Sequence, residues 1–322
     1  MIGKNNMLKI QKALHLHLEQ AKVKPNYIGK TYHVFEKFDG WYLFIDCING
    51  KWQGIRNKKG LLLPSMSHFS KLFEEVITPT KVDIRLCFEG TLLEKGEVPM
   101  IFSKLNGMFN QKHTPLCRGV RVDSKTFGEV LIHDIKLKVH DLILLDGTPK
   151  RFKDRYEDLK AFTRKAVNVD DLLWFNVVPI IGHSNDPARW QSMYEFIITK
   201  YDCQGEGIIL KESNALYHGG KRNSSLMKIK CEKSFELLVI GIEEGEGKYR
   251  DTLGKLVVQD ANGVINKISG MSDHLRNLWW ETPSLIKGKI VEIACMKVLP
   301  NKSLREGRFK AIRHDKDEID TL

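Results

Sequence analysis

The chain has 322 residues, of which 42% are hydrophobic and 28% are charged. This composition is typical of a globular protein, and the length allows one large domain and one small one. The 51 lysines and arginines outnumber the 40 aspartates and glutamates, which gives a formal net charge of +11. A positive balance favours a polyanionic partner. Nucleic acid is favoured over a membrane because no long basic amphipathic helix stands out.

The sequence shows no sign of targeting to a membrane or to an oxidising compartment. Its start has no uninterrupted apolar core of the kind a signal peptide needs, and no run of about 18 apolar residues predicts a membrane span. The six cysteines are widely spaced, with no CxxC pair and no short Cys/His cluster. This spacing argues against structural zinc and a disulfide framework, and it favours the cytoplasm, which is the host-cell cytoplasm if the protein is viral.

Hydrophobic periodicity and turn residues predict the elements of the first two thirds of the chain. In chain order they are a short packing helix within residues 7–21, hairpins between residues 32 and 64 with turns at Asn49-Gly50 and Lys59-Gly60, a helix over 67–76 capped by Ser67, a strand over 84–93, a strand over 139–145, helices over 154–166 and 193–201, and strands within 205–210 and 226–231. The elements follow no regular βαβ rhythm, so the pattern predicts an α+β fold with antiparallel sheets.

Residues 103–130 are polar and show little periodicity, which indicates a long loop or a small insertion. The segment is rich in basic residues: Lys104, Lys112, Arg118, Arg121 and Lys125. Contact with DNA and a solvated surface loop are equally compatible with this composition.

The character of the chain changes at Phe235. From there to Leu299, short strands alternate with glycine-rich turns, as in GEGKYRDTLG. A run of short strands in a small C-terminal unit predicts an OB-fold β-barrel, a fold that commonly binds nucleic acid. We therefore expect two domains, residues 1–234 and residues 235–322.

The segment TYHVFEKFDG, residues 31–40, contains a candidate nucleophile. Lys37 lies between two apolar runs that predict buried strands, so it is placed at a strand end. Lysines are rarely buried without a partner, and a lysine whose surroundings favour the neutral amine can act as a nucleophile. The three letters of KxDG do not decide between this role and a solvated lysine in a turn.

Further short motifs follow Lys37 in a fixed order: RNKKG (56–60), FEGTL (88–92), VHDL (139–142), EGIILK (206–211), MKIK (227–230) and LREGRFKAIRHDK (304–316). In this order the chain resembles the ATP-dependent DNA ligases of the covalent nucleotidyltransferase superfamily. The resemblance covers residues 32 to 316, and the brevity of the chain resembles the compact phage and viral type. It implies an adenylation domain in residues 1–234.

The resemblance implies an enzyme that uses ATP and Mg²⁺ to seal 3'-hydroxyl/5'-phosphate nicks in duplex DNA, as a monomer, in DNA replication, repair and recombination. A lysyl-AMP forms at Lys37, AMP passes to the 5'-phosphate, and the 3'-hydroxyl displaces it. Glu206 is placed as a metal ligand. Glu36 is placed at the nucleotide. Lys228 and Lys230, two apart on one predicted strand face, are placed at the α-phosphate.

Three positions depart from the family pattern. Tyr42 stands where KxDGxR has arginine, and Arg56 is our candidate to replace that contact at the nucleotide and the nick. FEGTL stands where the family has DGE. Here we assign Glu89, over Thr91, as ribose acceptor and second metal ligand because a carboxylate accepts more strongly from a hydroxyl. His140 stands where an aromatic residue stacks on adenine, and either stacking or simple packing fits an imidazole.

The C-terminal motif contains five basic residues. In the family this segment is a mobile arm that swings onto the active site. The resemblance therefore implies that it brings Arg313 and Lys316 to the pyrophosphate of ATP. As a solvated tail it would need no such role. Our candidates for DNA contact are Arg305, Arg308, Arg56 and Lys58, with Lys104 and Lys112 of the basic segment 103–130.

Other activities share these motifs. An mRNA-capping guanylyltransferase would use GTP, and an RNA ligase would seal RNA; small RNA ligases often lack the barrel. A non-catalytic OB-containing nucleic-acid binder is disfavoured because Lys37, Glu206, Lys228 and Lys230 are all present. An NAD-dependent ligase would carry an extra N-terminal domain and a cysteine zinc module.

Overall fold

The computed structural model describes residues 9–16, 29–92, 135–166, 174–203, 205–299 and 301–322. The chain divides into two compact units, Met1–Ile229 and Lys230–Leu322. The predicted boundary between residues 234 and 235 lies inside a strand of the second unit, whose first residue Lys233 already pairs with Cys295. The assignment of residues 1–234 to adenylation stays a prediction.

Two mixed sheets and three helices make up the described part of the first unit. The five-stranded sheet has the order β1-β11-β10-β2-β9, and the six-stranded sheet has the order β4-β3-β6-β7-β8 with β5 beside β3. The strands are β1 (Lys12–His15), β2 (Tyr32–Glu36), β3 (Trp41–Ile48), β4 (Lys51–Trp52), β5 (Arg56–Asn57), β6 (Ile84–Leu92), β7 (Ile135–Leu144), β8 (Phe175–Val177), β9 (Ile180–Ser184), β10 (Gly207–Glu212) and β11 (Arg222–Lys230). The helices are α2 (Ser67–Val76), α4 (Phe152–Ala166) and α5 (Pro187–Cys203).

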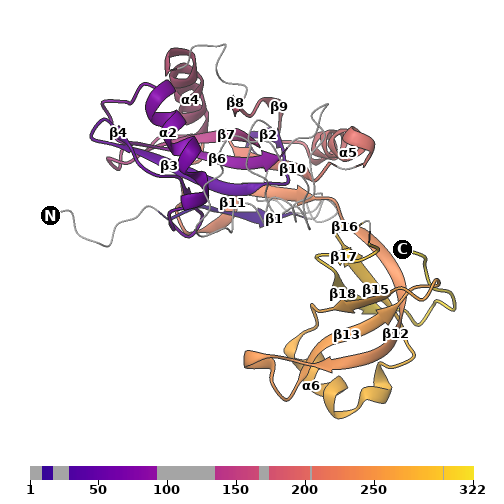
Figure 1. Cartoon of the computed structure of the whole chain (residues 1–322). Coiled ribbons are helices and arrows are strands. Elements are labelled where there is room, and N and C mark those ends of the chain that lie inside the picture. Colours follow the sequence, from indigo (N-terminus) through magenta and orange to yellow (C-terminus); the bar gives the residue numbers. More distant parts are fainter. Residues whose placement is uncertain (1–8, 17–28, 93–134, 167–173, 204, 300) are drawn as a thin grey trace. The chain divides into compact units, whose positions relative to one another are not determined.

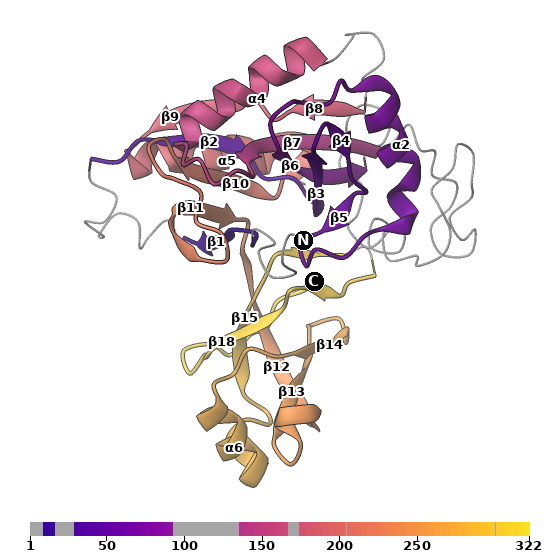
Figure 2. The same ribbon diagram turned by 90° about the vertical axis from the view of Figure 1, so that its left-hand side faces the viewer.

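Strand β3 shows how an apolar run positions the site. Leu43 and Ile45 are fully buried in the main core, which they share with Phe69 and Phe73 of α2. Successive side chains of a strand point to opposite faces, so Tyr42 and Phe44 face away from that core. Phe44 accordingly lies in a smaller cluster that Tyr42 also contacts. In Figures 1 and 2, α2 and α4 lie on one side of the unit, and β1 and β11 lie on the other.

The second unit contains a five-stranded sheet of order β14-β13-β12-β15-β18 and a two-stranded pair, β16 and β17. Neighbouring strands of the larger sheet pair antiparallel. The elements are β12 (Lys233–Glu244), β13 (Leu253–Gln259), β14 (Ile265–Ile268), α6 (Asp273–Glu281), β15 (Ile290–Cys295), β16 (Lys297–Val298), β17 (Leu304–Arg305) and β18 (Arg308–Ile312). The predicted α+β class and the small C-terminal β-unit are confirmed. The sheets of the first unit were predicted to be antiparallel but are mixed, because β1 pairs with β11 and β7 pairs with β8 in parallel.

Two local predictions are wrong, and helix α6 and strands β8 and β9 were not predicted. Residues 12–15 form strand β1, which pairs in parallel with β11, because backbone pairing outweighs the mixed apolar pattern that suggested a helix there. Ser67 is the first residue of α2 and not its cap, since a short 3₁₀ turn (Pro64–Met66) leads directly into the helix. Helix α6 was missed, although Ser272 caps it by accepting from the backbone N–H of Leu275 at 3.3 Å.

No helix among the described residues is long and apolar enough to span a membrane.

Gly40 is required where β3 approaches β6. A Cβ at this position would lie 2.8 Å from the Gly90 carbonyl oxygen and 3.0 Å from Thr91 Cγ2. Gly40→Ala should therefore lower the free energy of unfolding by about 1–3 kcal/mol, the usual cost of overpacking. Urea denaturation measures it. The matched control is Gly241→Ala, whose Cβ would meet Val257 at an ordinary 3.6 Å. A Gly40→Ala change as small as the control would contradict the prediction.

Candidate active site

The first unit contains a cavity of about 340 Å³. Residues of β1, β2, β3, β6, β7, β10 and β11 line it, together with residues of the loops between them. Lys37, Glu89, His140 and Lys228 are among the lining side chains. Four separate motifs of the sequence therefore meet at one cavity.

The pairing of β2 with β10 brings Lys37 to Glu206. The two strands are antiparallel, with Glu36 opposite Ile208, and the backbone N–H of Lys37 donates to the Gly207 carbonyl at 2.9 Å. The Lys37 ammonium lies 2.5 Å from Glu206 Oε2, and these side chains are 17% and 4% exposed. A charge-assisted hydrogen bond of this kind satisfies two groups that would be costly to bury alone.

Further carboxyl groups surround this pair. Burial raises the pKa of Glu89 to about 7, while the charge of Lys37 acts in the opposite direction. Burial also raises the pKa of Glu206, again against the effect of Lys37, and the buried Asp39 hydrogen-bonds Glu206. Three acids and one amine thus share a poorly hydrated region. This grouping suits a site that receives further positive charge, such as a metal ion.

The structure distinguishes the two candidate residues of the FEGTL motif, Glu89 and Thr91. Glu89 and Thr91 lie on the same face of β6, two residues apart. The Thr91 hydroxyl is buried and donates to the Lys136 carbonyl at 3.3 Å, whereas Glu89 lines the cavity. Of the two candidates, the position of Glu89 is the one open to a ligand, and its role stays a prediction.

The lysine pair of MKIK alternates on β11 as expected. Met227 and Ile229 are buried, while Lys228 and Lys230 lie on the other face. Lys228 lines the same cavity as Lys37. Lys230 falls in the second unit, where its ammonium lies 2.6 Å from Glu306. Only Lys228 is therefore brought together with Lys37 within one unit.

Other predicted residues are divided between cavity and surface. Glu36 and Lys58 line the cavity. Arg56 donates to the Gly60 carbonyl at 3.0 Å and is not among the described lining residues. Lys104 and Lys112, with the rest of residues 103–130, lie outside the described residues.

The basic residues of the C-terminal motif are paired within the second unit. Arg313 contacts Glu236 and lies 2.8 Å from Asp315, and Arg308 lies 2.6 Å from Glu232. Arg305 ends β17, and Lys316 is exposed. Their roles at pyrophosphate and DNA stay predictions.

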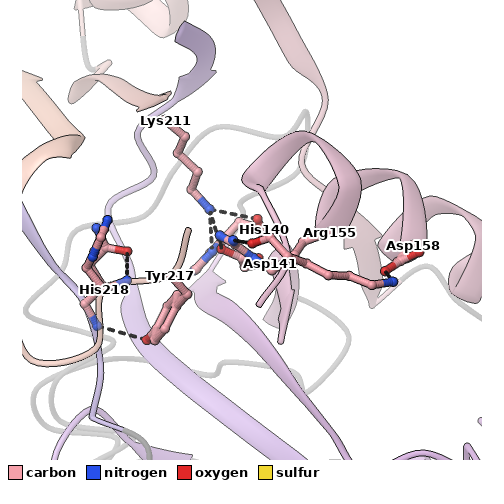
Figure 3. Close-up of polar contacts among 9 residues, drawn as sticks. His140, Asp141, Arg155, Asp158, Lys211, Tyr217 and His218 are labelled. Atoms are coloured by element: carbon pink, nitrogen blue, oxygen red, sulfur yellow. Dashed lines mark hydrogen bonds and ion pairs between the residues drawn. The ribbon is translucent and has the colours of Figure 1, made fainter. Parts of the chain in front are cut away.

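Sequence reasoning missed a buried ion cluster on the cavity wall. Asp141 accepts from Arg155 at 2.8 and 3.1 Å, and the Lys211 ammonium lies 3.5 Å from the same carboxylate. Figure 3 shows the ammonium pointing to His140 and Asp141. Lys211 ends the EGIILK motif and Asp141 belongs to VHDL, so the motifs could have flagged both. Nothing in the sequence singles out Arg155.

The chain is similar to known proteins in sequence and in structure. No family model matches the sequence. The DNA ligase of Methanoculleus marisnigri is 26% identical over 278 residues, which cover 77% of this chain and 46% of that protein. The DNA ligase of Methanothrix thermoacetophila is 30% identical over 171 residues, 52% of this chain and 27% of that protein. The chain thus spans less than half the length of these curated relatives.

Solved structures resemble nearly the whole chain. A structure titled "Pmar-Lig_Pre." has a TM-score of 0.70 at 21% identity and covers 96% of this chain and 68% of its own. A Lig E DNA ligase studied as a minimal DNA-binding scaffold has a TM-score of 0.68 at 19% identity, covering 96% of this chain and 100% of its own. The bacteriophage T7 ATP-dependent DNA ligase, in complex with ATP, has a TM-score of 0.51 at 17% identity and covers 95% and 98%.

The chain therefore has the fold of DNA ligases of known structure. It also resembles DNA ligases in sequence, and the resemblance found in its motifs is confirmed.

The raised pKa of Glu89 predicts a pH-dependent stability. Glu89 loses its proton near its ordinary 4.5 when unfolded and near 7 when folded. Between these values the folded state binds the proton more tightly, so the contribution of Glu89 to the free energy of unfolding falls as pH rises from about 4.5 to 7. Relative to Glu89→Gln, the wild type should lose on the order of 2–3 kcal/mol across this range.

Thermal unfolding of both proteins from pH 4.5 to 8 measures the difference. Glu75→Gln, at an exposed acid of α2, is the matched control and should follow the wild type at every pH. Parallel curves for the wild type and Glu89→Gln would mean that Glu89 ionises normally in the fold.

Proposed function

We propose that the protein is an ATP-dependent DNA ligase that seals 3'-hydroxyl/5'-phosphate nicks in duplex DNA through a lysyl-AMP intermediate. The contact of 2.5 Å between Lys37 and Glu206, at a cavity that Lys228 also lines, is the observation that carries the proposal. An amine, a proton acceptor and a further cation at one cavity are what nucleotidyl transfer to lysine requires.

The first step is the attack of the Lys37 amine on the α-phosphorus of ATP. The amine must lose a proton before it can attack, and Glu206 accepts a hydrogen bond from it. The proton can move to Glu206, whose pKa is raised by burial. An N–P bond then forms, the bond to pyrophosphate breaks, and AMP remains on Lys37.

Positive side chains around the cavity would neutralise the negative charge of the ATP phosphates. Lys228 comes from β11 and Lys58 from the turn after β5, and both line the cavity. Fixed cations that are already in place lower the barrier because they need no reorganisation as charge develops. Lys230, Arg313 and Lys316 belong to the second unit, and we propose that they add to this charge during the reaction.

Glu206 and Glu89 have the chemistry that a Mg²⁺ ion needs. Mg²⁺ is usually held by one or two carboxylates, with waters and substrate phosphate completing its six ligands. No cluster of three or more His, Cys, Asp or Glu side chains suited to a metal occurs among the described residues. The two carboxylates beside Lys37 are enough for Mg²⁺, which needs only one or two from the protein. When bound, the ion would neutralise phosphate charge.

We further propose that the protein acts as a monomer in a reducing compartment such as the cytoplasm. Cys47, Cys87, Cys231 and Cys295 are free thiols, which supports the compartment. The similarity to curated DNA ligases supports duplex DNA as the substrate, over the RNA of an RNA ligase or of a capping enzyme.

Covalent labelling tests the first step. Incubation with α-labelled ATP and Mg²⁺ should transfer the label to the protein, and Lys37→Ala should abolish the transfer because the only proposed nucleophile is gone. Lys30→Ala, at a partly exposed lysine near the start of β2, is the matched control and should label normally. Labelling by GTP and not by ATP would identify a capping guanylyltransferase instead.

Nick sealing tests the substrate. The adenylated protein should join a nicked all-DNA duplex without added ATP, and the Lys37→Ala variant should fail even with ATP. Denaturing gel electrophoresis of an end-labelled strand measures the product. Joining of nicked RNA with no joining of DNA would exclude a DNA ligase.

A further inference from the structure

The ion cluster beside His140 has more positive than negative charge. Asp141, which is 5% exposed, is shared between Arg155 and Lys211, and both cations are buried. The Arg155 guanidinium also donates to the Lys150 carbonyl at 2.8 Å. Lys211 completes its contacts with the faces of aromatic rings, 4.7 Å from the centre of Phe152. One carboxylate therefore balances two cations.

Lys211 contacts His140 twice. Its ammonium donates to the His140 carbonyl at 2.8 Å and lies 3.3 Å from His140 Nδ1. An ammonium has donors only, so Nδ1 must be the acceptor. In a neutral imidazole, the proton must then be on Nε2. The position of Lys211 thus selects one tautomer of His140.

The groups that face His140 also keep its ring neutral. Arg155 on α4 is positive and Asp141 on β7 is negative. Burial lowers the pKa of Lys211 on β10, and the charge of Asp141 opposes this effect and favours the ammonium. Tyr42 on β3 and Cys87 on β6 are uncharged because burial raises the pKa of each. Burial, followed by the charge of Lys211, lowers the pKa of His140 to about 3. The net positive charge around the ring would repel a second proton on it.

Tyr42 supports the ring from a further direction. The ring centres of Tyr42 and His140 are 5.4 Å apart, at an interplanar angle of 51°. Tyr42 occupies the position where the family pattern has arginine, and a guanidinium there would add a third cation beside His140. Both rings line the cavity. Tyr42 therefore contacts the ring without adding charge, and the net positive charge beside His140 comes from the cluster at Asp141.

We propose that Lys211 is a positioning residue that holds His140 as the neutral Nε2–H tautomer, so that its ring forms an uncharged platform on which the purine base of the nucleotide stacks. This inference rests on the proposed function for the identity of the ligand. The tautomer itself is a property of the protein alone, so it can be tested without activity.

Nitrogen-15 NMR of histidine-labelled protein reads the tautomer directly, because protonated and unprotonated ring nitrogens have distinct shifts. His140→Phe assigns the signals. In the wild type, Nδ1 should stay unprotonated and Nε2 protonated from pH 5 to 8. In Lys211→Met, His140 should lose this preference and titrate closer to the ordinary histidine value of about 6.5. Lys211→Arg, which keeps a cationic donor, should retain the wild-type signals.

Kinetics of adenylation test the platform. Lys211→Met should raise the KM for ATP roughly tenfold, with a smaller change in kcat, and its KM should rise further below pH 7 as the ring gains charge. Adding His140→Phe should remove this pH dependence, since phenyl cannot be protonated. Lys30→Met, which removes the ion pair of the neighbouring Glu212 at 3.1 Å, is the matched control and should behave as the wild type.

Each failure has its own meaning. A wild-type His140 that titrates near pH 6.5, or that has a protonated Nδ1, would overturn the tautomer assignment. A changed tautomer in Lys211→Met with an unchanged KM for ATP would overturn the role in base stacking. A wild type that forms no covalent adduct with any nucleotide would remove the proposed function, and the NMR result would still decide the role of Lys211.

Discussion

The pairing of β2 with β10 is the constraint on which the site depends. It joins Lys37 to Glu206 across 169 positions of sequence and holds their charged atoms 2.5 Å apart. Neither charge could be buried alone at acceptable cost, so each explains the presence of the other. The surrounding apolar strands exclude water, which strengthens this contact and every other charge interaction in the cavity.

Charge balance links the cavity to the chemistry proposed for it. On one side of Lys37, Glu89, Glu206 and Asp39 form an acidic group whose burial favours protonation or a cation. On the cavity wall at His140, the two positive charges of Arg155 and Lys211 outnumber the one negative charge of Asp141. In the proposed chemistry, the acidic region serves the amine and a metal, Lys58 and Lys228 serve the phosphates, and the wall at His140 serves the base.

The basic residues of the second unit are engaged in ion pairs of their own. Arg313 contacts Glu236 and Asp315, and Lys230 contacts Glu306. The exposed pairs among these are weak, because solvent screens them. Phosphate oxygens could therefore replace the carboxylates at small cost. A role for these residues at the nucleotide would involve such an exchange of partners.

Local sequence was sufficient for the features that depend on nearby residues. The hairpin turn at Asn49-Gly50, strands such as β3, β6, β10 and β12, and helices α2, α4 and α5 follow from periodicity and turn chemistry. Only the tertiary structure decided that residues 12–15 are a strand, because their backbone partners lie on β11. It also joined Lys211 to His140, 71 positions away. Contacts between distant residues depend on which strands become neighbours in a sheet, as β2 and β10 do, and a local pattern does not specify the partner strand.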